Sequence, residues 1–210
     1  MNKALKTFLI VIFLFSVGCD SQDVKLIKET RFLMGTLFDI TVSHPDVEKA
    51  REAIDKAFDE IQRIERLTSN FSPKSEVTKI NQNAGKQAYP VSKELYILLQ
   101  KSIQYSQLAN GTFDITIGAI QEFWKFEDEK GRIPAPKTIM NLLPLVDFRN
   151  VSLEENHQVR LKKKGMKLDL GAVAKGYAVD RGIDILKKHN IENAILNGGG
   201  DLKSIGEKSP

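Results

Sequence analysis

Cysteine is nearly absent from this 210-residue chain: Cys19 is the only one, so no disulfide can form within the chain. Histidine is also scarce, and its three copies, His44, His157 and His189, lie far apart in the sequence. No H-E-x-x-H motif joins two of them on one helix. The sequence therefore excludes a disulfide-stapled scaffold and gives no support for a zinc site.

The standard phosphate-binding and hydrolase motifs are missing as well. The segment GAVAKGYA, residues 171–178, lacks the glycine-lysine-hydroxyl ending of a P-loop. The segment GGGDLKSIG, residues 198–206, does not satisfy G-x-G-x-x-G, and no serine lies on a G-x-S-x-G elbow. Any nucleotide chemistry must therefore depend on a different kind of turn.

Long hydrophobic runs are limited to the N-terminus. An unbroken apolar run from Phe8 to Phe15 follows Lys3 and Lys6 and precedes the small residues of SVGC. A membrane-spanning helix needs about 20 apolar residues, so a permanent transmembrane anchor is disfavoured. The pattern predicts a signal peptide over residues 1–19 and one domain over residues 20–210.

Cys19 ends this leader directly after small residues, which resembles a bacterial lipobox. The thiol is then the expected site of lipid attachment, such as a palmitate chain. Asp20 resembles the signal that keeps enterobacterial lipoproteins on the inner membrane, so we expect an inner-membrane protein that faces the periplasm. A secreted protein with an incidental cysteine is the alternative.

Charge of one sign is not concentrated anywhere. The formal net charge is +4, and half of this excess belongs to Lys3 and Lys6 in the leader. No block of five like charges occurs, and the three lysines at 162–164 are interpreted as a solvated strand end. The sequence therefore does not imply a nucleic-acid partner.

The body of the chain alternates strand-like and helix-like patterns. Residues 31–43 predict a strand with a bulge or a close backbone approach at Gly35, and residues 45–64 predict a helix with an apolar stripe at three-and-four spacing. Ser75 is a candidate N-cap of a short helix. A further helix is predicted from Ser92 to about Leu108, ended by the Asn-Gly pair at 110–111.

The second half predicts more strands. Residues 111–126 indicate an alternating strand that leads into a short helix ending at Trp124, and residues 127–141 an exposed excursion. Segments 151–156 and 158–170 predict a hairpin, followed by a helix over 171–190 and a strand over 193–199. Paired strands together with helices favour an α+β fold, with a mixed sheet and flanking helices.

The stretch 167–201 is the best candidate for chemistry. Asp169 ends a predicted strand, Gly171 and Gly176 allow close approach to the backbone, and free N–H groups of the next helix can face an anion. Lys175 could reach a phosphate placed there, and an outward carbonyl could bind Mg²⁺. An ordinary strand-to-helix turn with a packing glycine and a solvated lysine accounts for the same spacing.

Four sequence blocks follow one another in a fixed order: MGT at 34–36, FSPKSEVTKIN at 71–81, GTFDITIGAIQEFWKF at 111–126, and LDLGAVAKGYAVDRG at 168–182 with NGGGD after it. Together these blocks resemble the ApbE family of FAD:protein FMN transferases. The resemblance implies a Mg²⁺-dependent enzyme that moves FMN from FAD to a threonine of a redox-subunit acceptor protein and releases AMP.

The resemblance also assigns residues, although it assigns no catalytic residue. Ala172 is expected to bind magnesium through its main-chain carbonyl, and Asp114 to accept hydrogen bonds from an adenine amine or a ribose hydroxyl. The residues expected to contact FAD are Met34, Phe71, Thr112, Phe113, Asp114, Asp169 and Lys175.

The chain departs from the family pattern at its C-terminal end, where it is expected to be incomplete. Members continue into a block like H-I-x-D-P-x-T-G and an aspartate-threonine pair that supplies other magnesium ligands, and neither follows here. Three alternatives stay open: hydrolysis of FAD to FMN and AMP, a non-catalytic FAD-binding lipoprotein, and an unrelated α+β lipoprotein.

Overall fold

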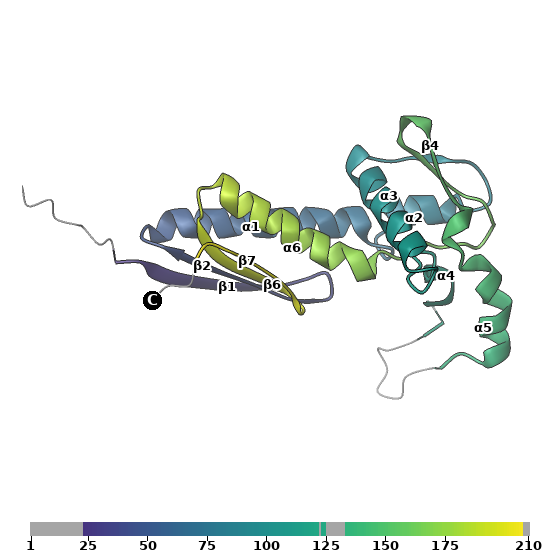
Figure 1. The fold of residues 1–210 in the computed structure, drawn as a ribbon, viewed down its shortest axis with the longest axis horizontal. Helices are drawn as coiled ribbons and strands as arrows, with labels where there is room; N and C mark the ends of the chain where they lie inside the picture. The colour runs from purple at the N-terminus through teal and green to yellow at the C-terminus, as the bar shows by residue number, and fades with distance from the viewer. Residues whose placement is uncertain (1–22, 122, 125–132, 208–210) are drawn as a thin grey trace, which may run out of the picture.

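A computed structural model describes residues 23–121, 123–124 and 133–207 (Figure 1). The predicted signal peptide, with Cys19, and residues 127–132 of the expected excursion lie outside this part of the chain. The helices are α1 (Val47–Thr68), α2 (Glu76–Gln82), α3 (Lys93–Leu108), α4 (Gly118–Gln121), α5 (Pro136–Leu142) and α6 (Gly171–Lys188). The strands are β1 (Lys25–Leu33), β2 (Thr36–His44), β3 (Tyr89–Pro90), β4 (Val151–Glu154), β5 (Gln158–Leu161), β6 (Asn193–Gly198) and β7 (Asp201–Ile205). Short 3-10 turns occur at Leu143–Leu145, Phe148–Asn150 and Glu155–His157.

The first lobe consists of a four-stranded sheet, in the order β1-β2-β6-β7, with α1 and α6 packed on one face (Figure 1). Alternate residues of β2 point toward these helices, and Phe38, Ile40 and Val42 are fully buried. Asp46 begins α1 by accepting hydrogen bonds from the amides of residues 48 and 49, which satisfies two of the free donors at a helix start. Ile54, Ile61 and other residues on one stripe of α1 complete this core.

The second lobe is smaller and contains α2 to α5 with a three-stranded sheet in the order β3-β5-β4. Leu95 and Leu99 of α3 and Val77 and Ile80 of α2 are buried against the strands and against Met166 and Leu168. The long helix α1 extends from the first lobe to the second, so it joins the two cores (Figure 1).

The α+β class predicted from the sequence is confirmed. In place of one mixed sheet, the described strands form two sheets, and each of their ladders is antiparallel. One parallel contact, an isolated bridge between Ile117 and Lys167, links the second lobe to the segment before α6. The helices predicted at 45–64, 92–108 and 171–190 are confirmed, as is the Ser75 cap. The hairpin predicted from 151–156 and 158–170 is confirmed in β4 and β5, but its second strand ends at Leu161, so Asp169 does not end a strand.

Two other local predictions are wrong. Residues 31–43 form a hairpin and not one bulged strand, because Met34 and Gly35 both adopt positive φ (51° and 76°) and reverse the chain. Residues 113–117 form a turn and not a strand, because the Asp114 carboxylate accepts hydrogen bonds from the amide and hydroxyl of Thr116. Beyond the predicted strand at 193–199, the structure adds β7 after a turn at Gly199 and Gly200.

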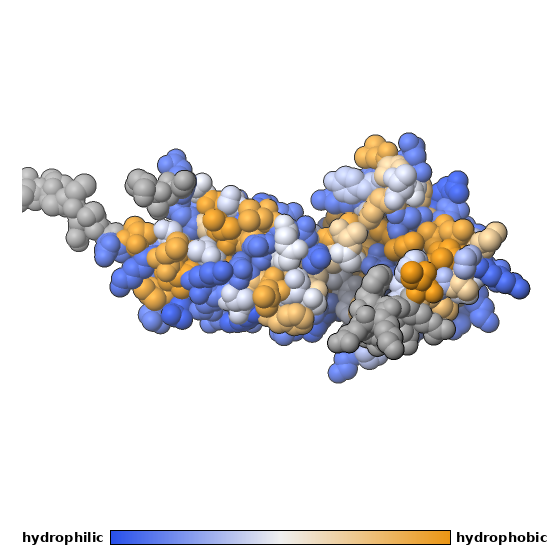
Figure 2. All heavy atoms as spheres, turned by 90° about the horizontal axis from the view of Figure 1, so that it is seen from below, coloured by the Kyte–Doolittle hydropathy of each residue, from blue (hydrophilic) through white to orange (hydrophobic). Residues whose placement is uncertain are grey.

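The other face of the first sheet is not covered by the described residues. Its exposed apolar side chains are Leu26, Phe32, Leu37, Ile195 and Leu202. Figure 2 shows apolar side chains between charged ones on this side of the molecule. In the described part of the chain, no helix is both long and apolar enough to cross a membrane.

Candidate functional site

The candidate site is the turn that leads from Lys167 into α6. Leu168 is fully buried, while Gly171 and Ala172 are exposed at the start of the helix. The backbone N–H of Asp169 donates to the carbonyl of Ile115, at 2.8 Å. The turn is thus anchored to the third sequence block, which lies more than 50 residues earlier in the chain.

Asn81 holds the same turn from the other side. Its side-chain amide donates to the carbonyl oxygen of Leu168 at 3.1 Å, and its side-chain oxygen accepts the Leu168 N–H at 2.7 Å. One amide side chain therefore satisfies both backbone groups of a buried residue, as a neighbouring strand would do. This contact connects the second sequence block to the fourth.

Asn70 fixes the Asp169 side chain. The Asn70 amide donates to one carboxylate oxygen of Asp169 at 2.6 Å, and the Gly171 N–H donates to the other at 2.7 Å. With a donor on each oxygen, the carboxylate has a fixed orientation. A carboxylate has about four lone-pair sites, so both oxygens can still accept from a ligand.

Gly118 lets the third block approach the turn closely. A Cβ atom at this position would lie 2.8 Å from the carbonyl oxygen of Lys167 and 3.0 Å from that of Leu168. These are backbone atoms that cannot rotate away. Glycine is therefore required here by the packing of α4 against the turn.

The start of α6 offers fewer free amides than the sequence predicts. The N–H of Gly171 is used by Asp169, and those of Val173 and Ala174 donate to the carbonyl of Leu170 at 2.9 and 2.7 Å. Of these first amides, only that of Ala172 has no partner within the described residues. The prediction of several free N–H groups facing an anion is therefore wrong.

The two charged side chains at the turn, Asp169 and Lys175, suit different ligand groups. The Asp169 carboxylate lies at the positive end of the α6 dipole, where it is stabilised, and it would repel a phosphate placed on the same spot. It is suited to hydroxyl or amine donors or to a cation. Lys175 is half-buried, one turn further along α6, and has no hydrogen-bond or ion-pair partner in the described part of the chain. It is the group suited to a phosphate.

Met34 is placed at the junction of the two lobes. Its side chain packs against both hydrophobic cores, and its N–H donates to a carboxylate oxygen of Glu65 on α1 at 2.9 Å. The positive φ of Met34 is uncommon for a residue with a side chain. The tip of the β1–β2 hairpin is thus held between the lobes.

The other predicted FAD contacts are more dispersed. Phe71 is 87% exposed in the loop after α1, next to Asn70, and Phe113 is half-buried against the second core. The Thr112 hydroxyl donates to the carbonyl of Ala109, at the end of α3. Asp114 accepts from Thr116 and from the N–H of Phe148, so it braces its own loop. No hydrogen bond joins Thr112 or Asp114 to the Asp169 turn within the described residues.

Sequence reasoning missed Asn70, Asn81 and Glu65. Each acts on a residue that is distant in sequence, so no local pattern identifies its partner. The one available signal is their position: Asn70 directly precedes the block 71–81, and Asn81 is the last residue of that block. Among the described residues, no group of three or more His, Cys, Asp and Glu side chains could hold a metal ion.

Fold and site together define a two-lobed α+β protein in which side-chain amides brace a glycine-containing turn at the start of a helix. Lys175 follows one helical turn later on α6. The chain belongs to the ApbE family, whose model matches residues 34–210.

Individual relatives agree with this assignment. The chain is 28% identical to an FAD:protein FMN transferase of Treponema pallidum, over 88% of this chain and 53% of the relative. It is 33% identical to one of Klebsiella pneumoniae, over 72% of this chain and 48% of the relative. The crystal structure of the ApbE protein of Thermotoga maritima has a TM-score of 0.80 at 32% identity and covers 88% of this chain and 60% of that one. The chain thus spans about half the length of the first two relatives.

Proposed function

We propose that this chain is part of a FAD:protein FMN transferase. The observation that carries the proposal is the turn carrying Asp169, Ala172 and Lys175, braced by Asn70 and Asn81, in a member of the ApbE family. The relatives named above bear that activity in their names. In the proposed reaction, an acceptor threonine hydroxyl attacks the FMN phosphorus of FAD. The anhydride bond to AMP breaks, AMP leaves with the bond electrons, and the hydroxyl proton passes to solvent water.

The residues of the turn have separate tasks in this proposal. The Asp169 carboxylate, fixed by Asn70 and Gly171, accepts hydrogen bonds from hydroxyl or amine groups of FAD. The ammonium group of Lys175 binds the diphosphate and opposes the charge that develops on the leaving AMP. Met34 and Phe71 provide apolar contacts for the flavin, and Phe71 has most of its ring available because it is exposed.

Magnesium is compatible with the residues at the turn. Mg²⁺ binds few protein oxygens and keeps water or substrate phosphates as its other ligands, so it needs no closed cluster of acidic side chains. Ala172 is exposed. Its carbonyl oxygen has two lone pairs, and a hydrogen bond within the helix uses only one of them, so the other can bind an ion. The Ala172 carbonyl would hold the ion. When bound, it would neutralise diphosphate charge.

The test is a transfer assay with FAD, Mg²⁺ and a periplasm-facing redox subunit as acceptor. In-gel flavin fluorescence on the acceptor, with AMP in solution, supports the transferase. An acceptor with its threonine changed to valine should stay unlabelled. AMP and FMN without labelled acceptor would indicate hydrolysis instead, and FAD retained without cleavage would indicate a binding protein.

The membrane location is a separate proposal. We propose that the protein is anchored in the bacterial inner membrane, facing the periplasm, by lipid on Cys19. The support is the apolar run of residues 8–15 followed by small residues and a cysteine. Metabolic labelling with a palmitate analogue should mark the wild-type protein and not Cys19→Ser. Equal labelling of both would contradict the anchor.

A further inference from the structure

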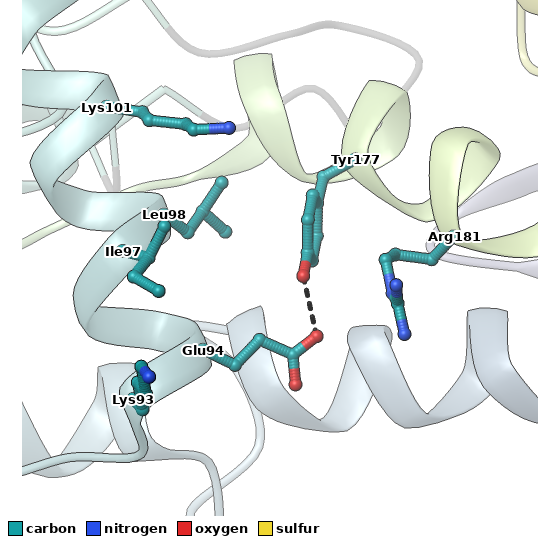
Figure 3. Close-up of a pocket in the computed structure, with 7 residues that line it drawn as sticks. All are labelled: Lys93, Glu94, Ile97, Leu98, Lys101, Tyr177 and Arg181. Carbon is teal, nitrogen blue, oxygen red and sulfur yellow. Dashed lines mark hydrogen bonds between the residues drawn. The ribbon is translucent and has the colours of Figure 1, made fainter. Parts of the chain in front are cut away.

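A pocket lies between α3 and α6, and no residue of the turn at Asp169 lines it. Its volume is about 410 Å³, and it is lined by Lys93, Glu94, Ile97, Leu98, Lys101, Tyr177 and Arg181. Figure 3 shows the Tyr177 ring of α6 facing Ile97 and Leu98 of α3 across this space. None of the residues assigned to FAD lines it. Its volume is within the usual range for small-molecule sites, about 300–1,000 Å³.

The one acidic residue that lines this pocket, Glu94, already has partners within the protein. The Glu94 carboxylate accepts two hydrogen bonds from the Arg63 guanidinium, both at 2.7 Å, and one from the Tyr177 hydroxyl at 2.7 Å. The hydrogen bonds from Arg63 lower the pKa of Glu94 despite its partial burial. The carboxylate therefore stays ionised at neutral pH and is committed to the protein.

The cations around the pocket are less well satisfied. Lys93 and Lys101 lie about two turns apart on α3, at opposite ends of the pocket (Figure 3), and neither has a hydrogen-bond or ion-pair partner among the residues that the structure describes. Figure 3 shows the Lys101 side chain extending over the pocket toward α6. The Arg181 guanidinium uses only part of its donor capacity: it donates to the carboxylates of Glu60 and Asp184, both at 3.2 Å.

We propose that this pocket binds a small aromatic phosphomonoester. The flat body of the ligand lies between the Tyr177 ring and the aliphatic side chains of Ile97 and Leu98, where it is removed from water. Its phosphate lies beside the ammonium group of Lys101, which extends over the pocket (Figure 3), while Lys93 and Arg181 at the other edges add longer-range attraction. Phosphate is a strong acceptor for an ammonium donor, and the cations around the pocket outnumber its one carboxylate. The proposal rests on this pocket alone and does not depend on the flavin reaction.

The test uses the isotope-labelled 210-residue chain and phenyl phosphate as the probe, with phenol and inorganic phosphate as half-ligands. Nuclear magnetic resonance titration should give saturable shifts at the backbone amides of Ile97, Leu98, Tyr177 and Arg181. Each half-ligand should bind at least about tenfold more weakly than phenyl phosphate, because each makes only one kind of contact.

Matched variants localise the binding. The double variant Lys93→Gln/Lys101→Gln should weaken phenyl phosphate binding at least about tenfold. Lys56→Gln, at an exposed position of α1, should leave it unchanged. All three lysines are exposed, so these changes preserve the core. Absence of saturable shifts, shifts confined to residues 169–175, equal binding of inorganic phosphate, or equal loss in Lys56→Gln would each overturn the proposal.

Discussion

At the scale of single residues, two asparagine side chains and one glycine determine the shape of the Asp169 turn. Asn81 takes both backbone groups of Leu168, Asn70 orients the carboxylate of Asp169, and Gly118 leaves room for the carbonyl groups of the turn. None of them bears a charge. They act by holding charged groups in place, so their loss should alter stability and ligand affinity together.

Replacement of Asn81 should be costly. Asn81→Ala leaves the N–H and the carbonyl of buried Leu168 without partners, which should lower the free energy of unfolding by about 2–3 kcal/mol. Urea unfolding followed by circular dichroism measures the change. Gln82→Ala, at the exposed neighbouring position, should change it by less than about 0.5 kcal/mol. Equal losses in the two variants would show that Asn81 does not hold the turn.

Two glycine substitutions should have opposite effects. Gly118→Ala places a methyl group against backbone oxygens and should destabilise the protein by about 1–3 kcal/mol. Gly176→Ala, in α6, meets no atom within 4 Å and should stabilise it by up to about 1 kcal/mol through helix propensity. Thermal unfolding of both variants gives the signs. A neutral Gly118→Ala would mean that α4 does not pack closely on the turn.

Sequence reasoning reached part of this site. It identified Asp169 and Lys175, because a glycine-flanked acid before a helix and a lysine inside it are local patterns. It could not pair Asn70 with Asp169, which lie 99 residues apart. It also overestimated the number of free amides at the start of α6, because the Asp169 side chain accepts a hydrogen bond from the N–H of Gly171, two residues later.

At the scale of elements, an ion-pair network joins α1, α3 and α6. Arg63 of α1 contacts Glu94 of α3 and Glu60 of its own helix, while Arg181 of α6 also contacts Glu60. Tyr177 completes the connection through Glu94, and burial, together with its hydrogen bond to the Glu94 carboxylate, raises the pKa of the Tyr177 phenol to about 12. The network lies where α3 of the second lobe meets the helices of the first.

This network should make stability depend on acid pH. Hydrogen bonds from Arg63 lower the pKa of both Glu60 and Glu94 below the ordinary value of 4.5. Their contribution is therefore present above about pH 4.5 and is lost as the pH falls through the lowered values. Glu94→Gln should therefore lose less of its free energy of unfolding than wild type does as the pH falls below about 4.5. Urea unfolding across this range measures the difference.

A matched control uses Glu52, an exposed residue of α1 outside the network. Glu52→Gln should lose as much of its free energy of unfolding below about pH 4.5 as wild type does. If Glu94→Gln and wild type lose stability in parallel below pH 4.5, Glu94 is not a source of the pH dependence.

The long helices were the most predictable part of the fold. The long helices α1, α3 and α6 each have an apolar stripe, and α1 and α3 have a capping residue, so periodicity identifies them. The hairpin at Met34 and Gly35 was not predictable in the same way. A glycine between two apolar segments is compatible with a bulge or with a turn, and only pairing of β1 with β2 distinguishes them.

At the scale of the whole molecule, the two lobes meet along α1 and beside the start of α6. Met34 contacts both cores from the hairpin tip, and the Asp169 turn is braced by residues of the second lobe while its helix belongs to the first. The arrangement of lobes follows from contacts that are distant in sequence. Composition and periodicity therefore indicate the α+β class without indicating two separate sheets.

The central claim is that the diphosphate of FAD binds at this turn, with Lys175 as its cation. Calorimetric titration of FAD with Mg²⁺ into the protein tests it directly. Lys175→Gln should weaken binding about 10- to 150-fold, the loss expected for a charge-assisted contact. Lys187→Gln, at the exposed other end of α6, should bind as wild type does. Equal affinity of the two variants, or no FAD binding by the wild-type protein, would contradict the account.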